Sequence, residues 1–149
     1  METKSGKLSW ILLLIVHCVV IILGFMFLFV PTVFIVNEFQ SFTGQQWSDF
    51  KALNPQVASY IAIASFELGI FILITGISAL FITLFAYRNG EKWAWYLFLI
   101  LNTIGWGGAI SGNLYTGDMI VVTICIVFLV IAYVGLAIAG KAILKKVST

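Results

Sequence analysis

Four long runs of apolar residues set the strongest limit on what this chain can fold into. They lie at about residues 8–30, 57–86, 93–110 and 119–140. The first can cross a hydrocarbon core of about 30 Å as a helix that rises about 1.5 Å per residue. Only 9% of the 149 residues are charged, against roughly a quarter in a soluble domain, which excludes a soluble globular protein. We therefore predict an all-α polytopic membrane protein, a single four-helix bundle over residues 1–149.

The sequence does not determine the residue at which the second membrane span begins. Asn54 and Pro55 are typical of a helix opening, as N-cap and first-turn proline, yet Glu67 interrupts the apolar residues that follow. Residues 68–86 alone give about 28 Å of helix, which nearly fills the hydrocarbon core. We favour one long helix whose first turns project beyond the membrane or lie along its surface. Glu67 is then expected near the outer interface.

The basic residues predict the orientation. If the four runs alternate across the membrane, only Lys51 falls on one side. The others are Lys4, Lys7, Arg88, Lys92, Lys141, Lys145 and Lys146. Positive charge gathers on the cytoplasmic side, so we expect a multi-pass protein of the cell membrane with both termini inside.

This orientation gives one larger outer loop, residues 31–56, between the first two spans. A short glycine-rich link from Ser111 to Asp118 joins the last two. Within the larger loop, Ser48 is expected to cap a short helix through Leu53 that lays Phe50 on the membrane. Phe39, earlier in the loop, stands between polar residues.

Small residues repeat at helical spacing in three of the runs. In lipid, helices associate through close packing and interhelical hydrogen bonds, and small residues permit that packing. On the second span such residues follow spacings of four, seven, three and four from Ser65 to Thr83, which places them on one face. The predicted helix-packing residues are Gly69, Gly76, Ala79, Gly105, Gly108, Gly112 and Gly135. Most of these contacts are expected within the chain and the remainder with other chains.

Three polar residues share one predicted depth. His17, Ser78 and Asn102 each lie ten residues inward from a basic anchor, which is about 15 Å and near the membrane midplane. One interpretation is a polar layer that binds a small ligand or relays a proton through His17. The favoured one is a structural layer in which neutral His17 bonds to Asn102 or to a backbone carbonyl.

Four carboxylates belong to the predicted outer side and are candidates for a ligand or ion site. They are Glu67, Glu38, Asp49 and Asp118. Glu67 is the acidic residue flanked by long apolar stretches, and it shares a helical face with Ser78. Glu67 is expected to face a groove, another subunit or the lipid headgroups. A cation site built from these carboxylates has no spacing motif to support it.

No catalytic, cofactor or metal motif is present. The chain lacks HExxH, GxSxG, Walker and CxxC patterns, and its net charge of +2 gives no nucleic-acid footprint. Cys18 and Cys125 stand alone in apolar runs. We therefore expect no cofactor, no metal and no nucleic-acid partner, and an enzyme is the less favoured class.

The segment from Arg88 to Tyr96 resembles small four-span bacterial and archaeal proteins in which a basic turn precedes an aromatic pair, a resemblance that implies no activity. With four spans and a carboxylate, the chain is also similar to the small multidrug-resistance transporters. In that family the essential glutamate lies in the first span, whereas the first span here carries only His17. That difference argues against the assignment.

Three functional hypotheses follow. The leading one is a non-catalytic accessory or assembly subunit that packs in the bilayer against other membrane subunits or a second copy. The second is a small-solute transporter or a lipid-binding or ligand-binding protein that uses Glu67. The third is an integral-membrane enzyme that uses His17 or the outer carboxylates.

Overall fold

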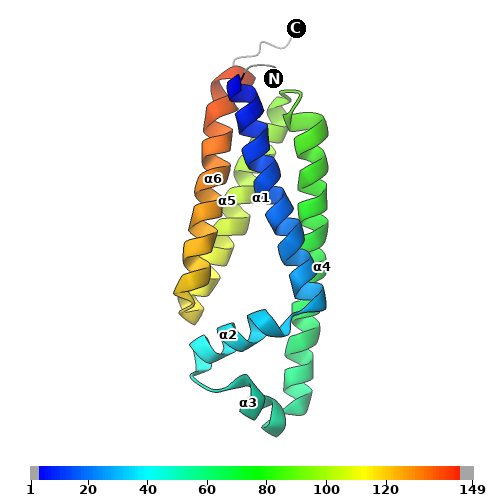
Figure 1. Ribbon diagram of the computed structural model, residues 1–149, viewed down its shortest axis with the longest axis vertical. Helices are drawn as coiled ribbons and strands as arrows, with labels where there is room; N and C mark the ends of the chain where they lie inside the picture. Colours follow the sequence, from blue (N-terminus) through cyan, green and yellow to red (C-terminus); the bar gives the residue numbers. More distant parts are fainter. Residues whose placement is uncertain (1–3, 145–149) are drawn as a thin grey trace.

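The computed structural model describes residues 4–144, and all regular elements in that part of the chain are helices (Figure 1). Four of them are long and apolar enough to cross a membrane. They are α1 (Lys4–Phe29), α4 (Pro55–Ile82) with its continuation η1 (Thr83–Tyr87), α5 (Lys92–Thr116) and α6 (Met119–Leu144). The prediction of an all-helical chain is confirmed for the described residues, as is that of four helices able to span a membrane.

The second span is one continuous helix through Glu67. Pro55 occupies its first turn, where the missing N–H costs no hydrogen bond. Asn54 holds the N-cap position, but its side chain makes no capping hydrogen bond. Its Nδ2 instead donates to the carbonyl oxygen of Phe50 at 3.4 Å.

The third span extends to Thr116 rather than ending near residue 110. Two polar side chains in the extension return hydrogen bonds to the helix, since Ser111 donates to the Gly107 carbonyl (2.9 Å) and Asn113 to that of Ala109 (2.8 Å). The helix ends at Gly117, whose φ of 82° is left-handed and costs glycine little. The expected link from residue 111 is therefore mostly helix.

The segment between the first two spans contains two helices, α2 (Thr32–Thr43) and α3 (Trp47–Leu53). The expected short helix through Leu53 is present, but Ser48 lies inside it and Gln46 holds the N-cap position. The helix begins two residues earlier than expected, and its first residue, Trp47, is buried against α2 and α4. The Ser48 hydroxyl donates to the Asp49 carboxylate at 3.3 Å instead.

The start of α1 and the end of α6 lie at one end of the bundle, here called the terminal end, and α2 and α3 lie at the other, the α2 end (Figure 1). The turn between η1 and α5 is also at the terminal end, where the Arg88 guanidinium lies 5.1 Å from the ring centre of Trp10. Lys145 and Lys146, and the side chain of Lys4, lie outside the described part of the chain.

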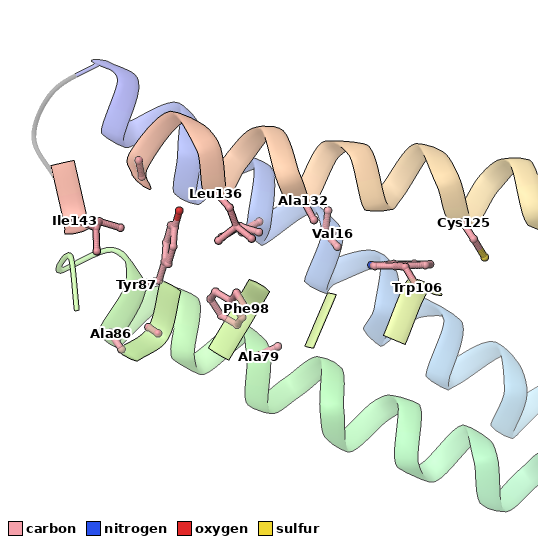
Figure 2. Packing of buried hydrophobic residues seen from close by; sticks show 13 residues of the cluster. Val16, Ala79, Ala86, Tyr87, Phe98, Trp106, Cys125, Ala132, Leu136 and Ile143 are labelled. Atoms are coloured by element: carbon pink, nitrogen blue, oxygen red, sulfur yellow. The ribbon is translucent and has the colours of Figure 1, made fainter. Parts of the chain in front are cut away.

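The four spans form two pairs. Helix α1 packs along α4, α5 packs along α6, and the two pairs meet through α1 and α6. They separate toward the α2 end, where α2 crosses between them (Figure 1). The main core lies in the half of the bundle nearer the terminal end, where Tyr87, Phe98 and Leu136 converge from η1, α5 and α6 (Figure 2).

Candidate functional site

The seam between α1 and α4 depends on three glycines that leave no room for a side chain. A Cβ placed on Gly24 would lie 2.7 Å from the Cα of Leu73, and one on Gly69 would lie 2.8 Å from the Cβ of Phe27. One on Gly76 would lie 3.0 Å from a backbone nitrogen of α1. This small-residue face of α4 is therefore in backbone contact with α1, the close approach that small residues allow in lipid.

A polar clamp ties α6 to the other helices near the terminal end. Ser9 donates to the Gly135 carbonyl at 2.6 Å, so Tyr87, at 2.7 Å, donates its hydroxyl proton to Ser9 Oγ. The next carbonyl of α6, that of Leu136, accepts a hydrogen bond from Trp95 Nε1 at 2.9 Å. Ser9 and Tyr87 are fully buried. Two neighbouring carbonyls of α6 thus bind side chains of α1 and α5 directly, and Tyr87 of η1 joins them through Ser9.

His17 is buried and hydrogen-bonded to Thr83 of η1, not to the expected Asn102 or to a backbone carbonyl. Its Nδ1 lies 2.8 Å from Thr83 Oγ1. Thr83 donates its own proton to the Ala79 carbonyl at 2.8 Å, so Nδ1 carries the proton that Thr83 accepts. The ring of Phe98 packs on the imidazole, 4.7 Å between centres. His17 therefore joins α1 to α4 as a packed, hydrogen-bonded group.

The π-helix η1 carries both residues whose hydroxyls bond to side chains of α1. The Arg88 N–H bonds to the Thr83 carbonyl five residues earlier at 3.0 Å, which is the π pattern. In this wider turn Thr83 and Tyr87 both face α1, where they meet His17 and Ser9. The two residues are four apart, a spacing that shares one face in an ordinary α-helix as well.

The structure does not gather the three residues of the expected midplane layer into one hydrogen-bonded group. Asn102 is buried, but its Nδ2 donates to the Phe98 carbonyl of its own helix at 2.8 Å. Ser78 is exposed on the surface of α4. His17 is thus the member of the three that bonds to another helix.

The small residues of α5 and α6 differ in their surroundings. A Cβ on Gly135 of α6 would lie 3.2 Å from the Ser9 carbonyl oxygen. On α5 four glycines would meet no atom within 4 Å in the described part of the chain. These are Gly105, Gly107, Gly108 and Gly112, and we call them the α5 glycine face.

Three of the four candidate carboxylates lie on or next to three different helices and do not form a shared site. Asp118 caps α6, since its Oδ1 accepts from the Val121 N–H at 3.1 Å. Asp49 lies in the first turn of α3, where a negative charge is favoured. Glu67 is exposed on α4. Within residues 4–144 no three His, Cys, Asp or Glu side chains come together as a metal site would require.

The fourth, Glu38, is on α2 and lines a cavity together with α4 and α5. The sequence placed Glu38 among the outer carboxylates but gave no reason to separate it from the others. The clamp residues Ser9 and Tyr87 and the seam residue Gly24 had no sequence signal of their own. Each is a single residue without a partner at helical spacing, and each matters through a contact distant in the chain.

No family model, no curated protein and no solved structure matches this chain. The assignment therefore goes as far as the fold: a multi-pass, all-helical membrane protein with four candidate spans.

Proposed function

We propose that this chain is a non-catalytic accessory or assembly subunit of a larger membrane protein complex. The observation that carries the proposal is the α5 glycine face. Glycine costs helix stability relative to alanine, by about 1 kcal/mol in a helix interior. Four such residues in one span, none packed against the described chain, are accounted for if another transmembrane helix lies against them.

The hydrogen bonds of the buried polar side chains also support a non-catalytic subunit. Among the described residues every fully buried side-chain nitrogen or oxygen atom has a hydrogen-bond partner. His17, Ser9 and Tyr87 hold helices to one another. These groups are accounted for by packing, which favours a scaffold over a catalytic or proton-relay role.

Purification in mild detergent followed by mass spectrometry of co-purifying chains tests the proposal. The wild type should bring down a second membrane protein or a second copy, and Gly108→Ile should lose that partner. Ile124→Phe, which adds bulk on an exposed position of α6, is the matched control and should keep it. A monodisperse monomer for the wild type, or equal recovery with Gly108→Ile, contradicts the proposal.

We further propose that the terminal end faces the cytoplasm and the α2 end faces outward across the cell membrane. Lys7, Arg88, Lys92 and Lys141 belong to the terminal end, and Lys51 to the α2 end, which supports this orientation. In intact cells a single cysteine at Gln45, on a background without Cys18 and Cys125, should react with a membrane-impermeant maleimide. A cysteine at Asn89 should react only after lysis. The reverse labelling pattern would show that the orientation is opposite to the one proposed.

A further inference from the structure

Helix α2 bridges the separated ends of the two helix pairs. Its Ile35 packs with Trp47 of α3 and Ala58 of α4 in a small buried cluster. Toward its other end, Phe42 lies against Tyr115 of α5, 5.6 Å between ring centres. The helix therefore spans from α4 to the last turn of α5 (Figure 1).

An open surface cavity of about 210 Å³ lies beside this bridge. Its walls come from three helices: Ile35, Glu38, Phe39 and Phe42 of α2, Ile61 and Ser65 of α4, and Thr116 of α5. The four α2 positions follow the spacing i, i+3, i+4, i+7 and so form one face of that helix.

Glu38 is the charged residue on this otherwise apolar face of α2. A carboxylate on the solvent-facing side of an amphipathic helix would need no explanation, but Glu38 lines the cavity with Ile35 and Phe39. It is an exposed side chain, so the cavity is open to ligands at this point. Within the described chain no hydrogen bond or ion pair holds its carboxylate.

The other two polar groups of the cavity are also acceptors. Ser65 donates its hydroxyl proton to the Ile61 carbonyl (2.9 Å), and Thr116 donates to the carbonyl of Asn113 (3.2 Å). With those protons engaged, each hydroxyl oxygen offers lone pairs only. Among the described lining residues, the side chains thus present three acceptors, one of them negative, and no free donor.

This arrangement selects one chemical class of ligand. An anion or a phosphate would meet acceptors alone. A divalent metal ion needs six or more oxygen ligands, and one carboxylate with two hydroxyls falls short of that. A primary ammonium group supplies one positive charge and three donors, and the Phe39 and Phe42 rings favour a nearby cation and an apolar chain. We propose that the cavity binds a primary ammonium group carried on an apolar chain, with Glu38 as its counter-charge.

Equilibrium dialysis of labelled hexylamine, cationic at pH 7, tests the proposal on the full chain in phosphatidylcholine nanodiscs. The wild type should bind one equivalent, and Glu38→Gln should weaken binding about tenfold, because a hydrogen bond to a charged group is lost. Glu67→Gln removes an equal charge from α4 at a position that does not line the cavity, and is the matched control; it should bind as the wild type does. Hexanol, of similar size but neutral, should not distinguish wild type from Glu38→Gln.

The proposal is overturned if the wild type and Glu38→Gln bind hexylamine with equal affinity and have the same thermal melt. It is also overturned if the wild type does not bind hexylamine. Ser65→Ala gives an independent check, with an expected loss of about threefold from one acceptor. A second arm separates the sources of the ligand. If nanodiscs containing phosphatidylethanolamine suppress hexylamine binding to the wild type, the site takes a lipid headgroup; if binding persists, it takes a free amine. The result is independent of whether a partner subunit is found.

Discussion

The small-residue faces of α4 and α5 have similar sequence patterns and opposite surroundings. On α4, Gly69 and Gly76 leave less than a side chain's room between the helix and α1, whereas Gly105 and Gly108 on α5 face nothing within 4 Å. The pattern therefore identifies a helix face that permits close packing, but not the chain that supplies the other helix. The α4 face is used inside the described chain, and the α5 face is the one available to another.

The largest expected effect comes from filling the α4 face. Gly76→Ile places a branched side chain where even a Cβ would lie 2.9 Å from Ile21 Cγ1, so overpacking should destabilise the bundle by about 3 kcal/mol. A thermal melt in detergent measures it. Gly108→Ile, on the α5 face, is the matched control and should melt close to the wild type. An unchanged melt for Gly76→Ile would show that the seam is not packed as described.

A smaller loss is expected from one added methyl group on the α1 side of the same seam. In Gly24→Ala the new carbon would lie 2.7 Å from the backbone of Leu73, and backbone cannot move aside as a flexible side chain can. The expected destabilisation is about 2 kcal/mol, read from the same melt. Stabilisation by Gly24→Ala, as helix propensity alone predicts, would contradict the close approach of α1 and α4.

Removing a clamp hydroxyl tests whether the packed half also depends on hydrogen bonds. Ser9→Ala removes the group between Tyr87 and the Gly135 carbonyl, and hydrogen bonds between membrane helices contribute about 1 kcal/mol or less. We expect a loss of about 1 kcal/mol, measured as above. In the Tyr87→Phe background Ser9→Ala should cost less than alone. Additive losses would show that the two hydroxyls act separately.

The smallest change is expected on the α5 face, with opposite sign. Gly108→Ala adds a methyl group in open space and improves helix propensity, so the isolated chain should gain about 0.5 kcal/mol. Sedimentation in detergent should show weaker association with its partner or second copy at the same time. A stability loss in the isolated monomer would mean that α5 glycines already pack within the chain.

Much of the fold could be predicted from sequence because lipid imposes long apolar helices. The four runs, the continuity of the second span through Glu67 and the proline in its first turn all follow from hydropathy and helix-opening residues. The prediction missed α2, although Ile35, Phe39 and Phe42 recur at helical spacing. Polar residues interrupt the apolar ones over residues 31–56, so the sequence alone predicts a loop there.

The contacts of the candidate site could be predicted less well. The His17 partner is Thr83, a residue that the sequence assigned to a small-residue stripe and not to hydrogen bonding. The separation of Glu38 from the other carboxylates depends on where α2 crosses α4 and α5, and this is a tertiary property. Local patterns identify faces of helices, and only the packing determines which faces meet.

The wide turn at Thr83–Tyr87 has a consequence for reading any sequence with this fold. It takes in one residue more than a regular helix would over the same rise, so the stripes before and after it are out of phase. A chain with a regular helix there would need one residue fewer between Ala79 and Arg88 to keep both ends of the span in place. An aligned sequence with a single gap at that point would thus preserve the architecture of the second span.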